Sequence, residues 1–121
     1  MALNVVVLEK DPALAQSLAG GLRPHFSVHL AGSHEHFLDN VARSHAQAVV
    51  LNLEHWPLCD IERLHQAFPE LPIVCTHRIP DEEMWMAALA AGACDVCPAG
   101  DINNVLSAIL RSTGIAGSAA A

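Results

Sequence analysis

The stretch Gln47-Ala-Val-Val-Leu-Asn-Leu53 predicts a buried β-strand that ends on a polar side chain. Residues 48–51 are continuously apolar and two of them are β-branched, as a strand covered on both faces requires. Asn52 follows at the carboxyl end, where ligands and chemistry collect in open parallel sheets. Because an amide is a poor nucleophile and a poor metal ligand, the reason for an asparagine at this position is the main functional question.

The order of patterns along the chain predicts an α/β fold. Apolar, strand-like runs alternate with segments of helical period, joined by short links, in five β-then-α units. Such an order predicts a five-stranded parallel sheet with helices on both faces. The predicted strands cover residues 3–8, 25–30, 47–53, 72–76 and 94–97, and a helix follows each of them, the third starting near Asp60.

Four local signals mark helix boundaries. Asp11-Pro12 predicts a helix start, because an N-cap acceptor is followed by proline at the first helical position. Leu14, Leu18 and Leu22 form one apolar stripe on this helix, and Gly20-Gly21 with Pro24 predict its end. Ser33 is expected to cap the second helix and Asp101 the last one.

Length and composition limit the class of protein. A chain of 121 residues that is 52% hydrophobic and 16% charged predicts one globular domain, over residues 1–112, with a flexible tail or linker over residues 113–121. The formal charge of −7 disfavours nucleic acid as a direct partner. No apolar run is long enough to span a bilayer, and no signal peptide precedes Glu9, so we expect a cytoplasmic protein with reduced cysteines and no membrane contact.

Four stretches of the chain resemble the receiver domain of bacterial response regulators. They are Val5–Leu14, Val49–Leu53, Pro72–Thr76 and Ala88–Val96, in the family's order and at approximately its spacing. The resemblance covers roughly residues 3–112 and implies the flavodoxin-like (βα)5 fold of that family.

The resemblance also implies a role for each position at the carboxyl edge of the sheet. Family receivers accept a phosphoryl group from a histidine kinase on an aspartate that ends the third strand. An acid pair holds Mg²⁺, a Thr or Ser ends the fourth strand, and a Lys ends the fifth. The matching positions here are Asn52 for the phosphoacceptor, Glu9 and Lys10 with the neighbouring Asp11 for the acid pair, Thr76 for the hydroxyl and Ala99 for the lysine.

These departures predict a degenerate pocket that has lost phosphotransfer. The charges of Glu9, Lys10 and Asn52 sum to zero, whereas a hard divalent cation requires several carboxylates. Without Mg²⁺ or the strand-five lysine, nothing neutralises a transferring phosphoryl group. His77, where many receivers have a small side chain, is expected to crowd the pocket further. We therefore expect no cofactor, Mg²⁺ included.

Two interpretations stay open for Asn52 and for Lys10. Asn52 is either a neutral mimic that locks one state or a hydrogen-bonded residue without a signalling role. Lys10 is either a counter-ion for Glu9 or Asp11, placed where the metal would lie, or a solvated loop lysine. Thr76 is interpreted as a structural hydroxyl at the end of its strand.

The cysteines and histidines can be interpreted as structural residues or as functional ones. Cys94-Asp-Val-Cys97 has the spacing of a redox or zinc motif, but side chains three apart on a strand point to opposite sides. No second such pair completes four zinc ligands, so both cysteines are interpreted as buried core thiols. Surface positions are expected for the histidines, with a pH-sensing or metal role as the alternative for His25, His29, His34 and His36.

The predicted fourth helix carries the predicted interaction surface. Met84, Ala88 and Ala91 are expected to face the sheet, at helical spacing. An exposed apolar stripe rimmed by charge has the composition of an interface centre. The resemblance implies that this face, with the fifth strand and fifth helix, binds a target protein or a second copy. The residues expected on it are Trp85, Leu89, Val96, Asp81 and Glu82.

Together these features predict an atypical, phosphorylation-independent receiver-like signalling domain that is not an enzyme. It is expected to act through protein–protein interaction or self-association. Two alternatives stay open. One is a phosphoaccepting regulator that uses Glu54 or Asp60, and the other is a small ligand- or metal-binding module of flavodoxin-like fold.

Overall fold

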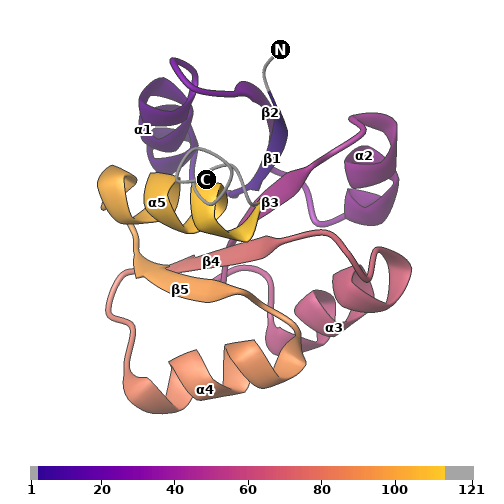
Figure 1. Cartoon of the computed structure of the whole chain (residues 1–121), viewed down its shortest axis with the longest axis vertical. Helices are drawn as coiled ribbons and strands as arrows, with labels where there is room; N and C mark the ends of the chain where they lie inside the picture. The colour runs from indigo at the N-terminus through magenta and orange to yellow at the C-terminus, as the bar shows by residue number, and fades with distance from the viewer. Residues whose placement is uncertain (1–2, 114–121) are drawn as a thin grey trace, which may run out of the picture.

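A computed structural model describes residues 3–113 of the chain (Figure 1). Five strands and five helices alternate along this part. Their bounds are β1 Asn4–Leu8, α1 Pro12–Leu22, β2 Ser27–Ala31, α2 Phe37–Arg43, β3 Ala48–Asn52, α3 Leu58–Ala67, β4 Ile73–His77, α4 Glu82–Ala91, β5 Asp95–Pro98 and α5 Ile102–Ser112. The predicted βα order is confirmed.

All five strands are parallel and form one sheet in the order β2-β1-β3-β4-β5. The chain reverses its direction of travel across the sheet between β1 and β3, which makes this pair the topological switch point. Every strand ends at the same edge, so the loops that follow β1, β3 and β4 meet there (Figure 1). The predicted (βα)5 fold is therefore correct.

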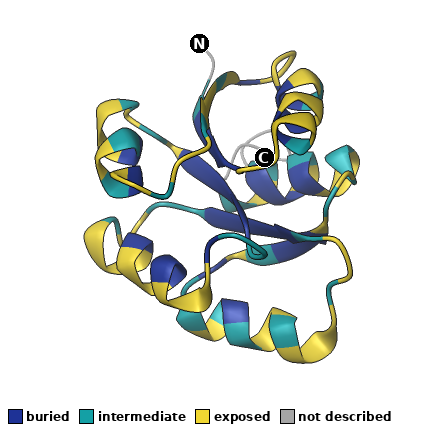
Figure 2. Cartoon of the chain, turned by 180° about the vertical axis from the view of Figure 1, so that it is seen from behind, coloured by how far each residue is buried: buried dark blue, intermediate teal, exposed yellow. Residues whose placement is uncertain are grey.

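Helices cover both faces of the sheet and bury its central strands (Figure 2). Along β1, Val6 and Leu8 pack into the cluster that contains residues of α2, α3 and α4. Val5 and Val7 point the other way, into the cluster formed with α1 and α5. The same alternation along β3 explains why its run had to be apolar at every position before Asn52.

Two predicted helix starts are confirmed. Asp11 caps α1 by accepting from the N–H groups of Ala13 and Leu14, and Asp101 caps α5. Helix α1 passes through Gly20-Gly21 and ends at Leu22, the last residue of its predicted apolar stripe and two residues before Pro24. A Cβ at Gly21 would lie 2.5 Å from a side-chain carbon of Ile102, so this glycine lets α5 approach α1 instead of ending the helix.

The starts of α2 and α3 differ from the prediction. Ser33 does not cap α2, because its hydroxyl accepts from the N–H of Glu35 in the preceding loop. The N-cap of α2 is His36, whose backbone is left-handed at φ 60°. Helix α3 begins at Leu58, after Pro57, which places Asp60 inside its first turn and buries it.

The two predicted core thiols of the CxxC stretch lie in different environments. Cys97 is buried in the α1/α5 cluster, and burial raises the pKa of its thiol to about 11. Cys94, one residue before β5, is exposed, which corrects the expectation for this residue. Both thiols are free, as expected.

No helix within residues 3–113 is long and apolar enough to cross a membrane. The tail predicted over residues 113–121 lies outside the described residues, except for Thr113.

Candidate functional site

The carboxyl edge of the sheet brings three of the predicted site residues together. Glu9 directly follows β1, Asn52 ends β3, and Thr76 pairs with Asn52 in the β3–β4 register. All three side chains are buried. Buried polar groups in one place require hydrogen-bond partners, so the arrangement of donors and acceptors decides what this site can bind.

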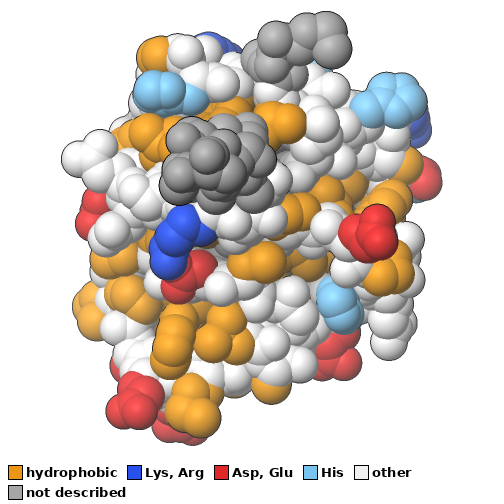
Figure 3. All heavy atoms as spheres, viewed as in Figure 1, with side chains coloured by type: hydrophobic (Ala, Val, Ile, Leu, Met, Phe, Trp, Pro, Cys, Tyr) orange, Lys and Arg blue, Asp and Glu red, His pale blue; other side chains and the backbone are white. Residues whose placement is uncertain are grey.

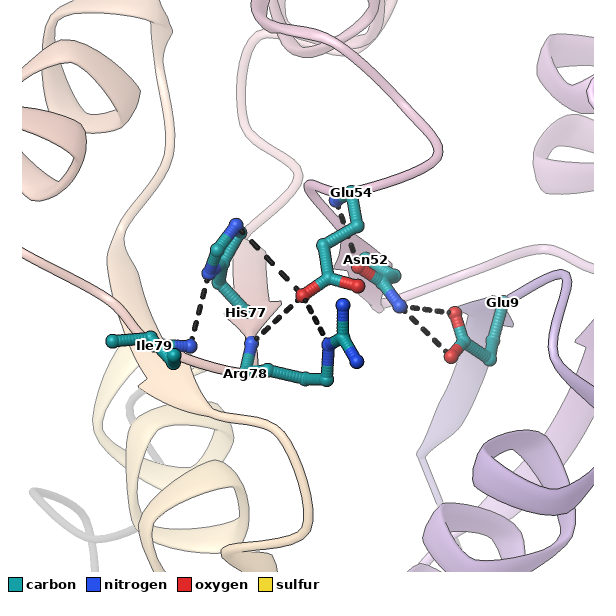
Figure 4. A network of polar contacts seen from close by, with 6 residues as sticks. All are labelled: Glu9, Asn52, Glu54, His77, Arg78 and Ile79. Atoms are coloured by element: carbon teal, nitrogen blue, oxygen red, sulfur yellow. Dashed lines mark hydrogen bonds and ion pairs between the residues drawn. The ribbon is translucent and has the colours of Figure 1, made fainter.

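Asn52 and Glu9 form a closed amide–carboxylate pair (Figure 4). The Asn52 Nδ2 amide donates to both carboxylate oxygens of Glu9, at 2.8 Å to Oε1 and 2.7 Å to Oε2. The Glu9 side chain is only 3% exposed. Hydrogen bonds to an ionised acceptor are stronger than neutral ones, so this pair satisfies a carboxylate that would otherwise be costly to bury.

The orientation of the Asn52 amide is fixed from two sides. Its Oδ1 accepts from the backbone N–H of Glu54 at 2.8 Å, while Nδ2 faces the Glu9 carboxylate. The reverse orientation would set an oxygen against two oxygens and a nitrogen against an N–H donor. Asn52 therefore presents a donor, and not a ligand atom, to the only carboxylate within its reach among the described residues.

Burial raises the pKa of the Glu9 carboxyl above its ordinary value, and the hydrogen bonds from Asn52 offset only part of this effect. Keeping the buried Glu9 carboxylate ionised therefore costs some folding free energy. Because its folded-state pKa is raised, Glu9 favours the folded state most at low pH. That contribution is lost as the pH rises through the raised value.

Lys10 and Asp11 are exposed beside the buried pocket. The Lys10 ammonium lies 5.6 Å from the ring centroid of Trp56, a cation–π distance, and no ion pair joins it to an acid within residues 3–113, so the counter-ion interpretation of Lys10 is not supported. Asp11 caps α1, and its negative charge contributes to the raised pKa of Glu9. The pocket is therefore acidic, and the predicted charge sum of zero is wrong.

A second set of contacts bridges the loops after β3 and β4 (Figure 4). Arg78 donates to Glu54 Oε1 from its backbone N–H at 3.2 Å and from Nε at 3.0 Å. His77 Nε2 lies 3.8 Å from the same oxygen, and the His77 ring accepts from the N–H of Ile79. The Arg78 guanidinium lowers the pKa of the Glu54 carboxyl. Glu54 thus anchors the start of the β4–α4 loop, and His77 lies beside this bridge.

The remaining two family positions, Thr76 and Ala99, carry no charge. The Thr76 side chain is buried next to Asn52, as expected for a strand-end hydroxyl. Ala99 follows β5 and donates its backbone N–H to the carbonyl of His77 at 2.9 Å. Its methyl group supplies no cation to the pocket.

These residues do not fit a magnesium ion. Mg²⁺ requires near-octahedral oxygen ligands, usually one or two carboxylates together with waters and phosphate oxygens. Here both oxygens of the buried Glu9 carboxylate accept from the Asn52 amide, and the neighbouring Asp11 is engaged as the cap of α1. Within the described part of the chain, no group of three or more His, Cys, Asp or Glu side chains is placed to hold a metal ion.

Asp60 lies in another cluster, on the α3 side of the molecule. It is 2% exposed, its Oδ2 lies 2.7 Å from His34 Nε2, and Arg63 Nη1 donates to its Oδ1 at 3.3 Å. His34 also packs at 5.1 Å, ring to ring, against Phe37. His34 is therefore a partner of a buried acid and not a free surface histidine as expected. The exposed His29 does lie on the surface.

The predicted interaction surface is present in part. Ala88 is buried against the sheet, while Trp85 is 42% exposed and donates from Nε1 to Asp95 on β5. Leu89 is half-buried, and Val96 belongs to the core, so Val96 cannot contribute to a surface. Figure 3 shows hydrophobic side chains over α4 in the lower part of the molecule, with acidic side chains at its lower edge. The acids of the first turn are the cap Asp81 with Glu82 and Glu83.

Sequence reasoning assigned no role to Arg78 and none to Trp56. Arg78 directly follows β4, and Glu54 is the second residue after β3. Because β3 and β4 are neighbours whose ends meet at one edge, this opposite-charge pair could have been predicted. The burial of Trp56 in the β3–α3 loop has no comparable local signal.

Comparisons by sequence identify no relatives: no protein-family model matches the chain, and no curated protein matches it. Solved structures do match over nearly the whole chain. A CheY-like protein (tadZ) from Pseudomonas aeruginosa is 27% identical, with a TM-score of 0.75 over 94% of this chain and 95% of that one.

More distant structures share the same fold. A response regulator from Thermotoga maritima is 18% identical, with a TM-score of 0.79 over 90% of this chain and 98% of that one. An atypical orphan response regulator, described with a phosphorylation-independent regulatory mechanism, is also 18% identical, with a TM-score of 0.80 over 92% and 95% of the two chains. The chain thus has the fold of the CheY-like receiver domain of response regulators.

Proposed function

We propose that this chain is a receiver-like signalling domain that works without phosphorylation, by binding another protein or a second copy of itself. The observation that carries the proposal is the Asn52–Glu9 pair, in which an amide closes the buried carboxylate that would otherwise bind a metal. Of the two interpretations of Asn52, the proposal adopts the neutral mimic that holds the domain in one state. The proposal includes no catalytic activity and keeps the cytoplasmic location expected from the sequence.

The geometry of Glu54 and Asp60 weighs against the phosphoaccepting alternative. Both Arg78 donors converge on one oxygen of Glu54 and keep it ionised and paired. Asp60 is buried in the first turn of α3, in contact with His34 and Arg63. A phosphodonor would have to displace these partners from Asp60, and at Glu54 it would meet an oxygen already paired with Arg78.

The partner-binding part of the proposal rests on the face formed by α4, β5 and α5. Asp95 joins its three elements, because it accepts from Trp85 Nε1 at 3.2 Å and from Arg111 Nη2 at 3.1 Å. Trp85 is thereby held over β5 with part of its ring exposed. A rigid, half-exposed tryptophan beside charged groups is a common interface anchor.

The first test is incubation with acetyl phosphate and Mg²⁺, followed by intact-mass measurement. We expect no added phosphate, because the pocket has neither a carboxylate at position 52 nor a site for the metal. A receiver with an intact acid pocket serves as the positive control. A stoichiometric adduct that maps to Glu54 or Asp60 would refute phosphorylation independence.

The second test is Trp85→Ala. If Trp85 is an interface hot spot, this change should weaken self-association or partner capture by about 2 kcal/mol or more while the fold stays intact. Sedimentation measures the assembly and a melting curve measures the fold. Unchanged assembly with a large loss of stability would instead place Trp85 in the core.

A further inference from the structure

A groove separates the N-terminal turns of α3 and α4, on the side of α4 that faces α3. Its volume is about 620 Å³. Apolar side chains from both sides line it, namely Leu53, Pro57, Leu58, Met84 and Ala87. It shares only Asp81 with the residues expected on the α4/β5/α5 face, and neither Trp85 nor any residue of β5 or α5 lines it.

Leu58 gives the groove an exposed apolar wall. This side chain is 38% exposed although it opens an amphipathic helix whose other two large aliphatic side chains, Ile61 and Leu64, are fully buried. Across the groove, Met84 and Ala87 are only half-buried. The space between these residues is large enough for one or two apolar side chains of another molecule.

The charged side chains that line the groove are all acidic. Asp81 and Glu83, both exposed, lie in the β4–α4 loop and the first turn of α4, and no Lys or Arg lines the groove. Asp81 Oδ1 accepts from the N–H of Met84 as the helix cap, which fixes the position of this carboxylate. An apolar groove with two carboxylates at its rim is complementary to a segment that carries both apolar and basic side chains.

The shape of the groove is set by contacts that need no phosphoryl group. His77 lines the groove and lies beside Glu54, whose carboxylate receives Arg78 at the start of the β4–α4 loop. The Asp81 cap then fixes the end of that loop. The α4 wall of the groove is therefore held in place by contacts within the chain.

We propose that this groove binds a short segment of a partner protein in which a large apolar side chain stands next to Lys or Arg. The apolar side chain lies between Leu58 and Met84, and the cation pairs with Glu83 and Asp81. The inference rests on the proposed function in one respect, that the chain works by binding proteins. The inference adds a second binding surface, the groove, and specifies the kind of peptide segment that this surface binds.

The test begins with selection of a random displayed peptide library on the full chain. Enriched peptides are expected to combine Leu, Ile, Met or Phe with an adjacent Lys or Arg. Amide NMR shifts caused by a selected peptide are expected at Leu58, Met84 and Ala87. Its affinity should fall as salt is added, because the acidic rim contributes to binding.

Two matched pairs of variants locate the binding site. Glu83→Lys should weaken the selected peptide about tenfold or more, whereas Glu82→Lys, the same charge change in the same helical turn outside the groove, should not. Leu58→Ser should weaken it similarly. Leu30→Ser is the control, since Leu30 is also 38% exposed but lies on the edge strand β2.

Each other outcome overturns the groove assignment. These outcomes are failure to enrich any peptide, enrichment of acidic peptides, and equal effects of Glu83→Lys and Glu82→Lys. Binding lost through Trp85→Ala but not through Glu83→Lys would move the partner to the α4/β5/α5 face, which contradicts the groove and leaves the proposed function intact. A phosphate adduct would contradict phosphorylation independence and leave the groove standing.

Discussion

Asn52→Asp is expected to lower the free energy of unfolding by about 3 kcal/mol near neutral pH. The change replaces the amide that donates to Glu9 by a second carboxylate, within about 3 Å of the first. Two buried carboxylates at that distance cannot both ionise without repulsion. Chemical denaturation of the variant and the wild-type chain measures the difference.

The loss should depend on pH in a defined direction. In the variant, the carboxyl pair has folded-state pKa values raised above those of the unfolded chain, because burial and the neighbouring charge both disfavour ionisation. The penalty is therefore absent below the ordinary carboxyl pKa of about 4 and grows as the pH rises through the raised values. In the wild-type chain the pKa of Glu9 is also raised, chiefly by burial, and the hydrogen bonds from Asn52 oppose this shift. The stability of the wild-type chain should therefore depend on pH in the same direction.

A charge-swapped double variant provides the matched control. Glu9→Gln combined with Asn52→Asp restores one amide and one carboxylate, with the same net charge as the wild-type pair. It should recover most of the lost stability and reduce the pH dependence of stability to about that of the wild-type chain. A single variant as stable as the wild type near neutral pH would mean that the pair is not closed as described.

Asn52→Asp should not restore phosphotransfer. Asp11 remains the cap of α1 and Ala99 provides no cation, so two of the family's charged groups are still missing from the pocket. Incubation of the variant with acetyl phosphate and Mg²⁺ should leave its intact mass unchanged. Efficient phosphorylation would mean that the pocket is closer to an ordinary receiver than we propose.

The strands could be predicted from sequence because each carries a dense local signal. Val5–Leu8, Ala48–Leu51 and Ile73–Cys75 are apolar at successive positions, which only a strand covered on both faces explains economically. The helix starts at Asp11 and Asp101 could be predicted for the same reason, since a capping side chain accepts from an N–H group only two or three residues further along the chain. The role of Gly21 could not be predicted, because it depends on the contact with Ile102 of α5, far along the chain.

The site could be predicted only where the backbone alone decides the position. Asn52, Glu9 and Thr76 follow or end neighbouring parallel strands and had to meet. Two interpretations of the Lys10 side chain stayed open, because a long flexible stem has several partners within reach, and the partner here is the ring of Trp56. That ring was itself not predicted to be buried, so this contact could not be predicted from sequence.

Trp56→Ala is the change with the largest expected cost, about 3–5 kcal/mol of unfolding free energy. Trp56 lies in the β3–α3 loop, yet its side chain is 0% exposed and belongs to the core cluster formed with α2, α3 and α4. Its backbone N–H donates to the carbonyl of Asn52 at 2.9 Å. A cavity here should therefore also loosen the turn that orients Asn52.

Trp56→Phe separates packing from polarity at the same position. The Trp56 Nε1 group is buried and has no hydrogen-bond partner among the described residues, a defect that phenylalanine removes while it keeps most of the apolar volume. We expect Trp56→Phe to change stability by less than about 1.5 kcal/mol. Thermal and urea unfolding followed by circular dichroism compare the two variants with Trp85→Ala as the partly exposed control. If Trp56→Ala lowers the free energy of unfolding by no more than Trp85→Ala does, then the Trp56 side chain is not held in the core. The β3–α3 loop would then not be the rigid turn that orients Asn52 toward Glu9.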